Sequence, residues 1–122
     1  MKIAVSAEGN TMESRIDQRF GRAASFIIVE TKNLDYEAID NSAAAASGGA
    51  GISAAQLVAD KGVEAVITGN VGPNAMNVLK AADIEIYKGS AATVKENVEL
   101  FKKGMLEKIN TTVPAHFGMG GK

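Results

Sequence analysis

The order of the apolar segments predicts an α/β fold in which helices cover a mixed five-stranded sheet. Two β-prone runs, 25–31 and 34–40, flank Lys32-Asn33 and indicate an antiparallel hairpin that follows a first strand over 2–6. The second half of the chain instead alternates helical and strand patterns, which is typical of parallel strands joined by right-handed crossovers. Together these observations predict the strand order 3-2-1-4-5, with only the second strand antiparallel to its neighbours.

The elements of the second half carry their own start and stop signals. Apolar residues at helical spacing predict a helix over 52–59 that ends at Gly62. A buried strand over 65–68 follows, and Pro73 suits the first position of a second helix whose apolar stripe extends to Ala82. We expect Gly72, just before this helix, to adopt a positive φ.

The last strand is predicted over 84–87, and a third helix follows it. Thr93 and Glu96 have capping-box spacing at the start of this helix, and Gly104 marks its end. The apolar stripe that faces the core consists of Val94, Val98 and Phe101.

Composition limits the classes of function. The 122 residues suit one domain, and 13 basic against 14 acidic residues give a net charge of -1, which argues against nucleic-acid or membrane-surface binding. The chain has no cysteine, which excludes disulfides and thiolate-ligated metal sites. The apolar run at the N-terminus is too short for a signal peptide, so we expect a cytoplasmic protein.

The predicted strand order brings three turns to one edge of the sheet. The loop over 8–22 and the turns over 68–74 and 88–93 all lie at the carboxyl ends of the parallel strands, where open α/β sheets bind ligands. Guanidinium groups of the loop and backbone N–H groups of glycine turns at helix starts suit an anion. The candidate ligand-binding residues are Arg19, Phe20, Gly21, Arg22, Gly51, Gly69, Asn70 and Gly72.

Each of these features has a purely structural alternative. The arginines can pair with Asp17, Glu13 or Glu8 of their own loop, and the glycines can serve helix starts alone. Neither central strand, 2–6 or 65–68, carries the carboxylates that two-metal phosphodiester cleavage requires, and no nucleotide-binding glycine motif is present. We therefore expect binding without catalysis and assign no metal ligand.

Three stretches of the sequence resemble the dinitrogenase iron–molybdenum cofactor-binding family over residues 1–106. They are RFGRAASFIIVE, the long segment from GGAGISAAQ to IEIYKG, and TVKENVELFKKGML. The resemblance implies a three-layer α/β/α fold with a ribonuclease-H-like motif, as in NifX-like carriers and the C-terminal domain of NifB-like proteins. It also implies binding of an iron–molybdenum cofactor or an iron–sulfur precursor cluster, with cluster-assembly proteins as partners.

Two positions depart from the family pattern. Cofactor-carrying members often have histidine before the Phe-Gly pair, where this chain has Arg19, and residues 43–46 are all alanine. We expect the protein to be purified without a cofactor. Residues 107–122 are predicted to form a flexible Gly-rich tail that contains His116, the only histidine. The alternative to a cluster carrier is a protein–protein interaction or regulatory domain without a bound cluster.

Overall fold

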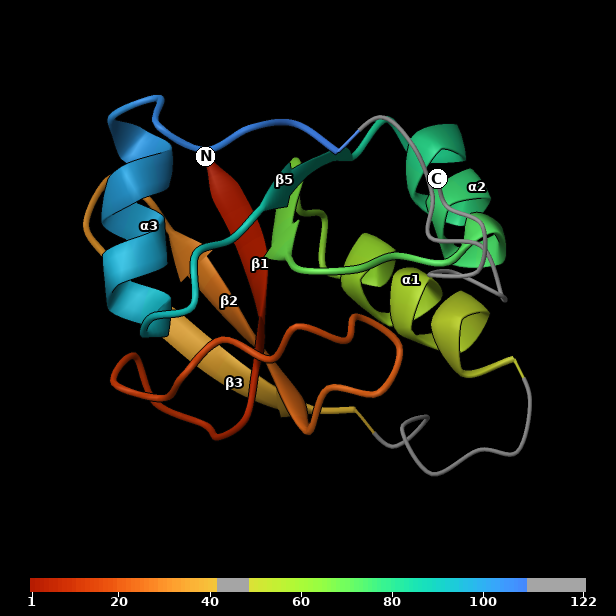
Figure 1. Cartoon of the computed structure of the whole chain (residues 1–122), viewed down its shortest axis with the longest axis horizontal. Helices are drawn as coiled ribbons and strands as arrows, with labels where there is room; N and C mark the ends of the chain where they lie inside the picture. The colour runs from red at the N-terminus through yellow and green to blue at the C-terminus, as the bar shows by residue number, and fades with distance from the viewer. Residues whose placement is uncertain (42–48, 110–122) are drawn as a thin grey trace, which may run out of the picture.

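The computed structural model describes residues 1–41 and 49–109. The described part contains five strands and three helices in the order βββαβαβα (Figure 1). The strands are β1 (Lys2–Ala7), β2 (Ser25–Glu30), β3 (Tyr36–Asp40), β4 (Ala65–Thr68) and β5 (Glu85–Lys88). The helices are α1 (Ala50–Asp60), α2 (Pro73–Ala81) and α3 (Val94–Lys102).

The five strands form one sheet in the order β3-β2-β1-β4-β5, which confirms the predicted topology. Strand β2 is antiparallel to both β1 and β3, whereas β1, β4 and β5 are parallel to one another. None of the described helices is long and apolar enough to cross a membrane.

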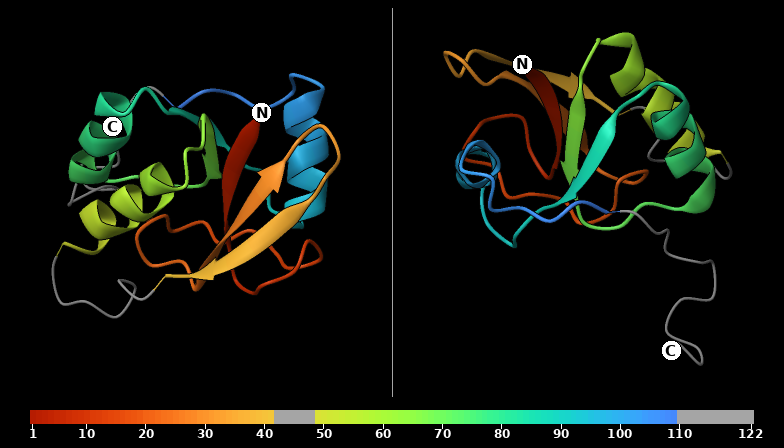
Figure 2. Two further views of the ribbon diagram at one scale, coloured as in Figure 1. Left: turned by 180° about the vertical axis from the view of Figure 1, so that it is seen from behind. Right: turned by 90° about the horizontal axis from the view of Figure 1, so that it is seen from above.

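Helices cover both faces of the sheet and complete the predicted three layers. Helices α1 and α2 pack on one face and α3 on the other, as the view from above shows (Figure 2). Strand β1 supplies both cores by alternation, because Ala4 faces α1 and α2 while Ile3 and Val5 face α3. The central strand is therefore buried on both sides, which explains why it reads as a continuous apolar run.

Most helix and strand ends lie within two residues of the predicted positions. The start of β3 differs because of the local backbone conformation. Gly62 and Gly104 end their helices with φ values of 72°, and Pro73 is the first residue of α2. Strand β3 begins at Tyr36 instead of the predicted residue 34, because Leu34 adopts a φ of 64° and donates its N–H to the Glu30 carbonyl within the hairpin turn.

Residues 107–109 belong to the fold, although the sequence placed them in the tail. The N–H of Ile109 donates to the Ile86 carbonyl at 2.7 Å, and the N–H of Lys88 donates to the Glu107 carbonyl at 2.8 Å. This short segment therefore runs antiparallel along the outer edge of β5. The rest of the predicted tail, including His116, lies outside the described residues.

Candidate functional site

The arginine loop and the turn after β4 are paired through their backbones. The N–H of Asn70 donates to the Gln18 carbonyl at 2.7 Å, and the N–H of Phe20 donates to the Asn70 carbonyl at 3.2 Å. Arg19 and Asn70 consequently form a parallel bridge at the end of the sheet where β1 and β4 finish. The structure thus brings together three candidate residues from two distant parts of the sequence.

Gly69 allows this close approach of the two backbones. A Cβ atom at this position would lie 2.6 Å from the Gln18 carbonyl oxygen and 2.8 Å from the Gln18 Cα atom. Both distances are shorter than real Cβ contacts, so any side chain would push the loop away. Gly69 is also buried. Its place in the structure is therefore explained by backbone packing.

Arg19 forms the ion pair that the structural alternative anticipated. Its Nε and Nη2 atoms each lie 3.1 Å from one oxygen of Asp17, and its backbone N–H donates to the same carboxylate at 3.0 Å. The hydrogen bonds and charge of Asp17 raise the pKa of the Arg19 guanidinium. Asp17 is only 3% exposed, whereas the Arg19 side chain is 67% exposed. Within residues 1–41 and 49–109, two of the five guanidinium N–H groups are bonded to protein acceptors, and the other three can donate to a further acceptor.

Asp17 is itself fixed to the sheet. Its N–H donates to the Ser6 carbonyl at 2.9 Å, and its own carbonyl accepts the Ser6 hydroxyl at 2.6 Å. The Ser6 hydroxyl also lies 2.7 Å from the Thr68 hydroxyl, so the ends of β1 and β4 share this anchor. The position of Arg19 is consequently set by buried groups at the carboxyl edge.

A cleft of about 200 Å³ lies beside this loop, at the starts of α1 and α2. Four candidate residues line it, namely Phe20, Gly21, Gly51 and Gly72. The others, Arg19, Arg22, Gly69 and Asn70, are not part of its lining. Arg22 follows Gly21 in the same turn, and its side chain is exposed.

The two helices present backbone N–H groups at the cleft. Their N-cap residues are Gly49 and Gly72, which have no side chain that could cap a helix. Among the described residues no acceptor bonds the N–H groups of the first turns, which are those of Ala50, Gly51, Ile52, Asn74 and Ala75. No carboxylate of residues 1–41 or 49–109 lines the cleft, so none of them offsets the partial positive charge of the two helix starts there.

Glycines also bring the three walls of the cleft together. A Cβ atom on Gly21 would lie 3.0 Å from the backbone nitrogen of Gly51, and a Cβ atom on Gly51 would lie 3.3 Å from the Cβ atom of Ala75. Gly72 differs from our expectation, because its φ of -75° and ψ of 168° are extended, and a Cβ atom added there would have no neighbour within 4 Å. The turn therefore does not need glycine for a positive φ. What glycine provides here is an N-cap position without a side chain, which leaves the first N–H groups of α2 uncapped.

The third predicted turn, over 88–93, is not open to a ligand. Gly89 is enclosed by Ile16, Ile67 and Asn97, and the Asn97 side chain bonds both the N–H and the carbonyl of Ser90. The glycine of this turn therefore has a packing role. Gly48, the remaining glycine of the connection before α1, lies outside the described residues.

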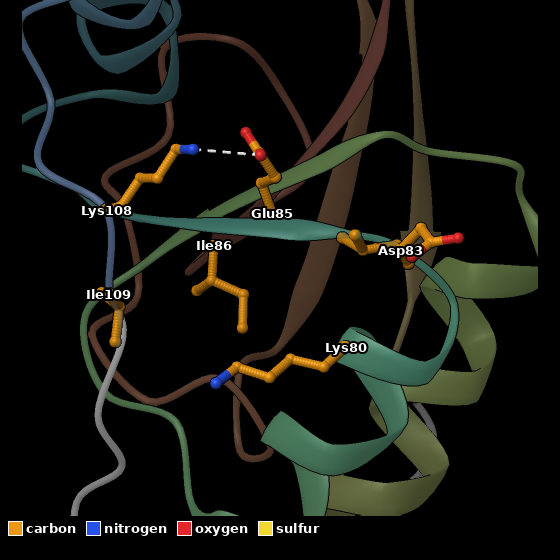
Figure 3. A pocket seen from close by; sticks show the side chains of 7 residues that line it. Lys80, Asp83, Glu85, Ile86, Lys108 and Ile109 are labelled. Atoms are coloured by element: carbon orange, nitrogen blue, oxygen red, sulfur yellow. Dashed lines mark hydrogen bonds and ion pairs between the residues drawn. The ribbon is translucent and has the colours of Figure 1, made fainter.

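A larger hollow of about 360 Å³ lies between β5, α2 and residues 108–109. Figure 3 shows the Lys80 side chain reaching toward it from α2, beside Ile86 and Ile109. Lys108 donates to Glu85 at 3.0 Å and lowers the pKa of that carboxyl, with the Tyr87 hydroxyl adding to the effect at 2.8 Å. None of the predicted residues lies here, and the paired charges fasten residues 107–109 to β5.

The sequence analysis missed five residues of the smaller cleft. They are Gly49, Ile52, Pro73, Asn74 and Ala75. Four of them belong to the helix-start motifs Gly49-Ala50-Gly51 and Gly72-Pro73-Asn74-Ala75, and Ile52 follows the first motif directly. These motifs could have been taken as whole segments instead of single glycines. In residues 1–41 and 49–109, no group of three or more His, Asp or Glu side chains could hold a metal ion. The cleft therefore suits an anion held by N–H donors.

These features define a small α/β domain with an anion-suited cleft at the carboxyl edge of its sheet. The profile of the family "Dinitrogenase iron-molybdenum cofactor" matches residues 1–104. The chain therefore belongs to this family, as the resemblance of its three stretches predicts.

Three relatives show how far the similarity extends. The uncharacterised protein MJ0580 of Methanocaldococcus jannaschii is 39% identical over 111 residues, which cover 88% of this chain and 91% of the relative. The apo form of the orange protein from Desulfovibrio gigas is 39% identical with a TM-score of 0.86, covering 89% and 92% of the two chains. A Thermotoga protein provisionally described as NifB is 37% identical with a TM-score of 0.80, covering 90% and 94%.

Proposed function

We propose that this protein is a small binding or carrier protein that holds an anionic ligand in the cleft between the starts of α1 and α2. The ligand class is an iron–molybdenum-type metallocluster, its precursor or a related anion. The protein binds this cargo without catalytic turnover and exchanges it with cluster-assembly proteins. Family membership supports the ligand class, and the existence of an apo form of the similar orange protein supports a ligand-binding role.

The main support for placing the ligand in this cleft is the pair of uncapped helix starts beside it. Two helices that are both long enough to have a dipole begin side by side, and both start with a glycine that cannot cap them. Four of the N–H groups without a partner among the described residues, those of Gly51, Ile52, Asn74 and Ala75, consequently belong to residues that line one small space, whose described lining contains no carboxylate. This arrangement stabilises negative charge on oxygen or sulfide atoms of a ligand through several weak contacts.

The residues that line the cleft suit hydrogen bonds to the non-metal atoms of a bound cluster. They do not suit direct coordination of its metal ions. Among its described lining residues the only polar side chain is the amide of Asn74, and the chain has no cysteine. A protonated arginine cannot coordinate a metal, and the charge of Arg19 is paired with Asp17, so Arg19 can offer only N–H donors beside the cleft. We therefore expect a cluster to bring its own ligands, and we expect its binding to weaken as salt screens these contacts.

The test is anaerobic titration with an isolated iron–molybdenum cluster precursor, followed by NMR of the backbone amides at low and high salt. The signals of Gly51, Ile52 and Asn74 should shift or broaden, and the affinity should fall at high salt. Perturbation confined to Lys80 and Lys108 would contradict the proposal and assign the ligand to the larger hollow. The absence of any binding would contradict it in favour of an interaction or regulatory domain.

A matched pair of variants tests the role of charge. Asn74→Asp adds a carboxylate to the cleft, whereas Asn77→Asp makes the same change one turn further along α2, outside the cleft lining. We expect Asn74→Asp to weaken precursor binding about tenfold, which corresponds to about 1.4 kcal/mol of repulsion and lost N–H donation. Asn77→Asp should change the affinity by less than about twofold. Equal effects of the two variants would indicate long-range charge alone.

A further inference from the structure

Asn41, the first residue after β3, connects the edge of the sheet to the wall of the cleft. It is only 4% exposed. Its side-chain Nδ2 donates to the carbonyl of Gly21 at 3.1 Å and to that of Ala23 at 3.0 Å. Its backbone N–H donates to the carbonyl of Ala24 at 3.1 Å. One buried residue therefore bonds three backbone carbonyls of the segment from Gly21 to Ala24.

The orientation of the Asn41 amide is fixed by its surroundings. The opposite orientation would place Oδ1 against two carbonyl oxygens, so the NH₂ group must face the turn. Oδ1 is then buried, and no donor among the described residues bonds it. Asn41 thus spends both hydrogens of its amide group on this turn, while its Oδ1 atom gains no hydrogen bond from the described residues.

We propose that Asn41 is a positioning residue for the cleft, which holds the Phe20–Gly21 wall at its distance from the start of α1. The inference rests on the proposed function of this cleft. The other side of the wall is closely packed, because a Cβ atom on Gly21 would lie only 3.0 Å from the backbone nitrogen and Cα atom of Gly51. Movement of Gly21 would therefore change the space in front of the α1 amides, where the anion binds.

The experiment compares Asn41→Ala and the milder Asn41→Ser with Asn33→Ala. Asn33 is an exposed asparagine of the distant hairpin turn, where its Oδ1 accepts the Asp35 N–H at 2.9 Å. In Asn41→Ala we expect the affinity for the isolated iron–molybdenum cluster precursor to fall about tenfold, as for other residues that orient a binding group. The unliganded Gly21 and Gly51 amide signals should shift, with smaller changes in Asn41→Ser. Asn33→Ala should leave both measurements unchanged.

The two readouts separate this inference from the proposed function. Unchanged Gly21 and Gly51 amide signals in both folded Asn41 variants would overturn the positioning role. If the wild-type protein binds no precursor, the proposed function fails, and the amide signals alone decide whether Asn41 positions the wall. If Asn41→Ala does not fold, Asn41→Ser decides in its place. Shifted amide signals with unchanged precursor affinity would also overturn the inference, because the wall would then be irrelevant to the ligand.

Discussion

The starts of α2 and α3 lie at the same edge of the sheet but differ in how their N–H groups are used. In α3, the N–H groups of Val94 and Lys95 donate to the carbonyls of Ser14 and Met12 at 2.8 and 2.9 Å. The next N–H, from Glu96, donates to the Thr93 side chain at 3.1 Å. In α2, by contrast, the cap is a glycine and the first residue is a proline.

This difference suggests that a helix start can serve a ligand only where no other part of the chain bonds its N–H groups. The loop over 8–16 supplies its carbonyls to α3, whereas within residues 1–41 and 49–109 no acceptor bonds the first N–H groups of α1 and α2. Glycine precedes all three helix starts in the sequence, so the presence of glycine alone does not distinguish them. The helix starts differ instead in the hydrogen-bond partners of their first N–H groups.

The largest effect should come from a glycine that is needed for packing. Gly69→Ala should lower the free energy of unfolding by about 1–3 kcal/mol, because its Cβ atom would overlap the backbone of Gln18. Gly72→Ala is the matched control, with open space around its Cβ position and a φ of -75°, and should change stability by less than about 0.5 kcal/mol. Urea denaturation of both variants measures the difference. Equal losses would mean that the two loops do not pack as closely as the structure shows.

Closing the α2 start should weaken ligand binding while keeping the fold. Gly72→Ser supplies a hydroxyl that can accept the Ala75 N–H, as Thr93 accepts that of Glu96 in α3. We expect the affinity for the cluster precursor to fall about fivefold, which corresponds to about 1 kcal/mol for one hydrogen bond. Stability should rise by a few tenths of a kcal/mol. Isothermal titration and a thermal melt test this, and unchanged affinity would show that this N–H does not contact the ligand.

The reverse change at α3 should cost stability without creating a new site. Thr93→Ala removes the side-chain cap and should lower the free energy of unfolding by about 1 kcal/mol. It should not add anion binding, because the carbonyls of Ser14 and Met12 still occupy the first two N–H groups. Titration with sulfate, followed by the amide signals of 94–96, checks the second part. A new sulfate site there would refute the role given to the 8–16 loop.

The smallest expected effect concerns the paired charges beside β5. The pKa of Glu85 lies below its ordinary value of 4.5, so its contribution is present above that pH and is lost as the pH falls through the lowered pKa. The pKa of Lys108 lies above its ordinary value of 10.5, so its contribution is lost only as the pH rises through the raised pKa. Residues 107–109 should thus be held best between these two values. The Ile109 amide signal measures this, and Glu85→Gln should remove the acidic transition.

The fold was largely predictable because its signals are local or follow from strand alternation. The capping box at Thr93, the proline at the start of α2 and the glycines after α1 and α3 all act within a few residues of their position. The strand order followed from the hairpin and from the handedness of crossovers. The turn at Leu34 escaped prediction because leucine rarely adopts a positive φ.

The candidate site was predicted only in part, because its geometry depends on long-range packing. The sequence indicated the edge of the sheet at which this cleft lies and four of the residues that line it. It could not show that Gly69 serves close contact with Gln18, since these residues meet only after β1 and β4 pair. Nor could it reveal the link from Asn41 to Gly21, which joins the end of the hairpin to the loop before it.

The short segment over 107–109 has a consequence for where this domain ends. The family profile stops at residue 104, after the last helix, yet the outer edge of β5 is hydrogen-bonded by residues beyond that point. A chain shortened to residue 104 would keep every strand and helix but would present bare N–H and carbonyl groups along β5. An uncovered strand edge is a template for pairing with another chain, so we expect residues 105–109 to be needed to keep this edge closed.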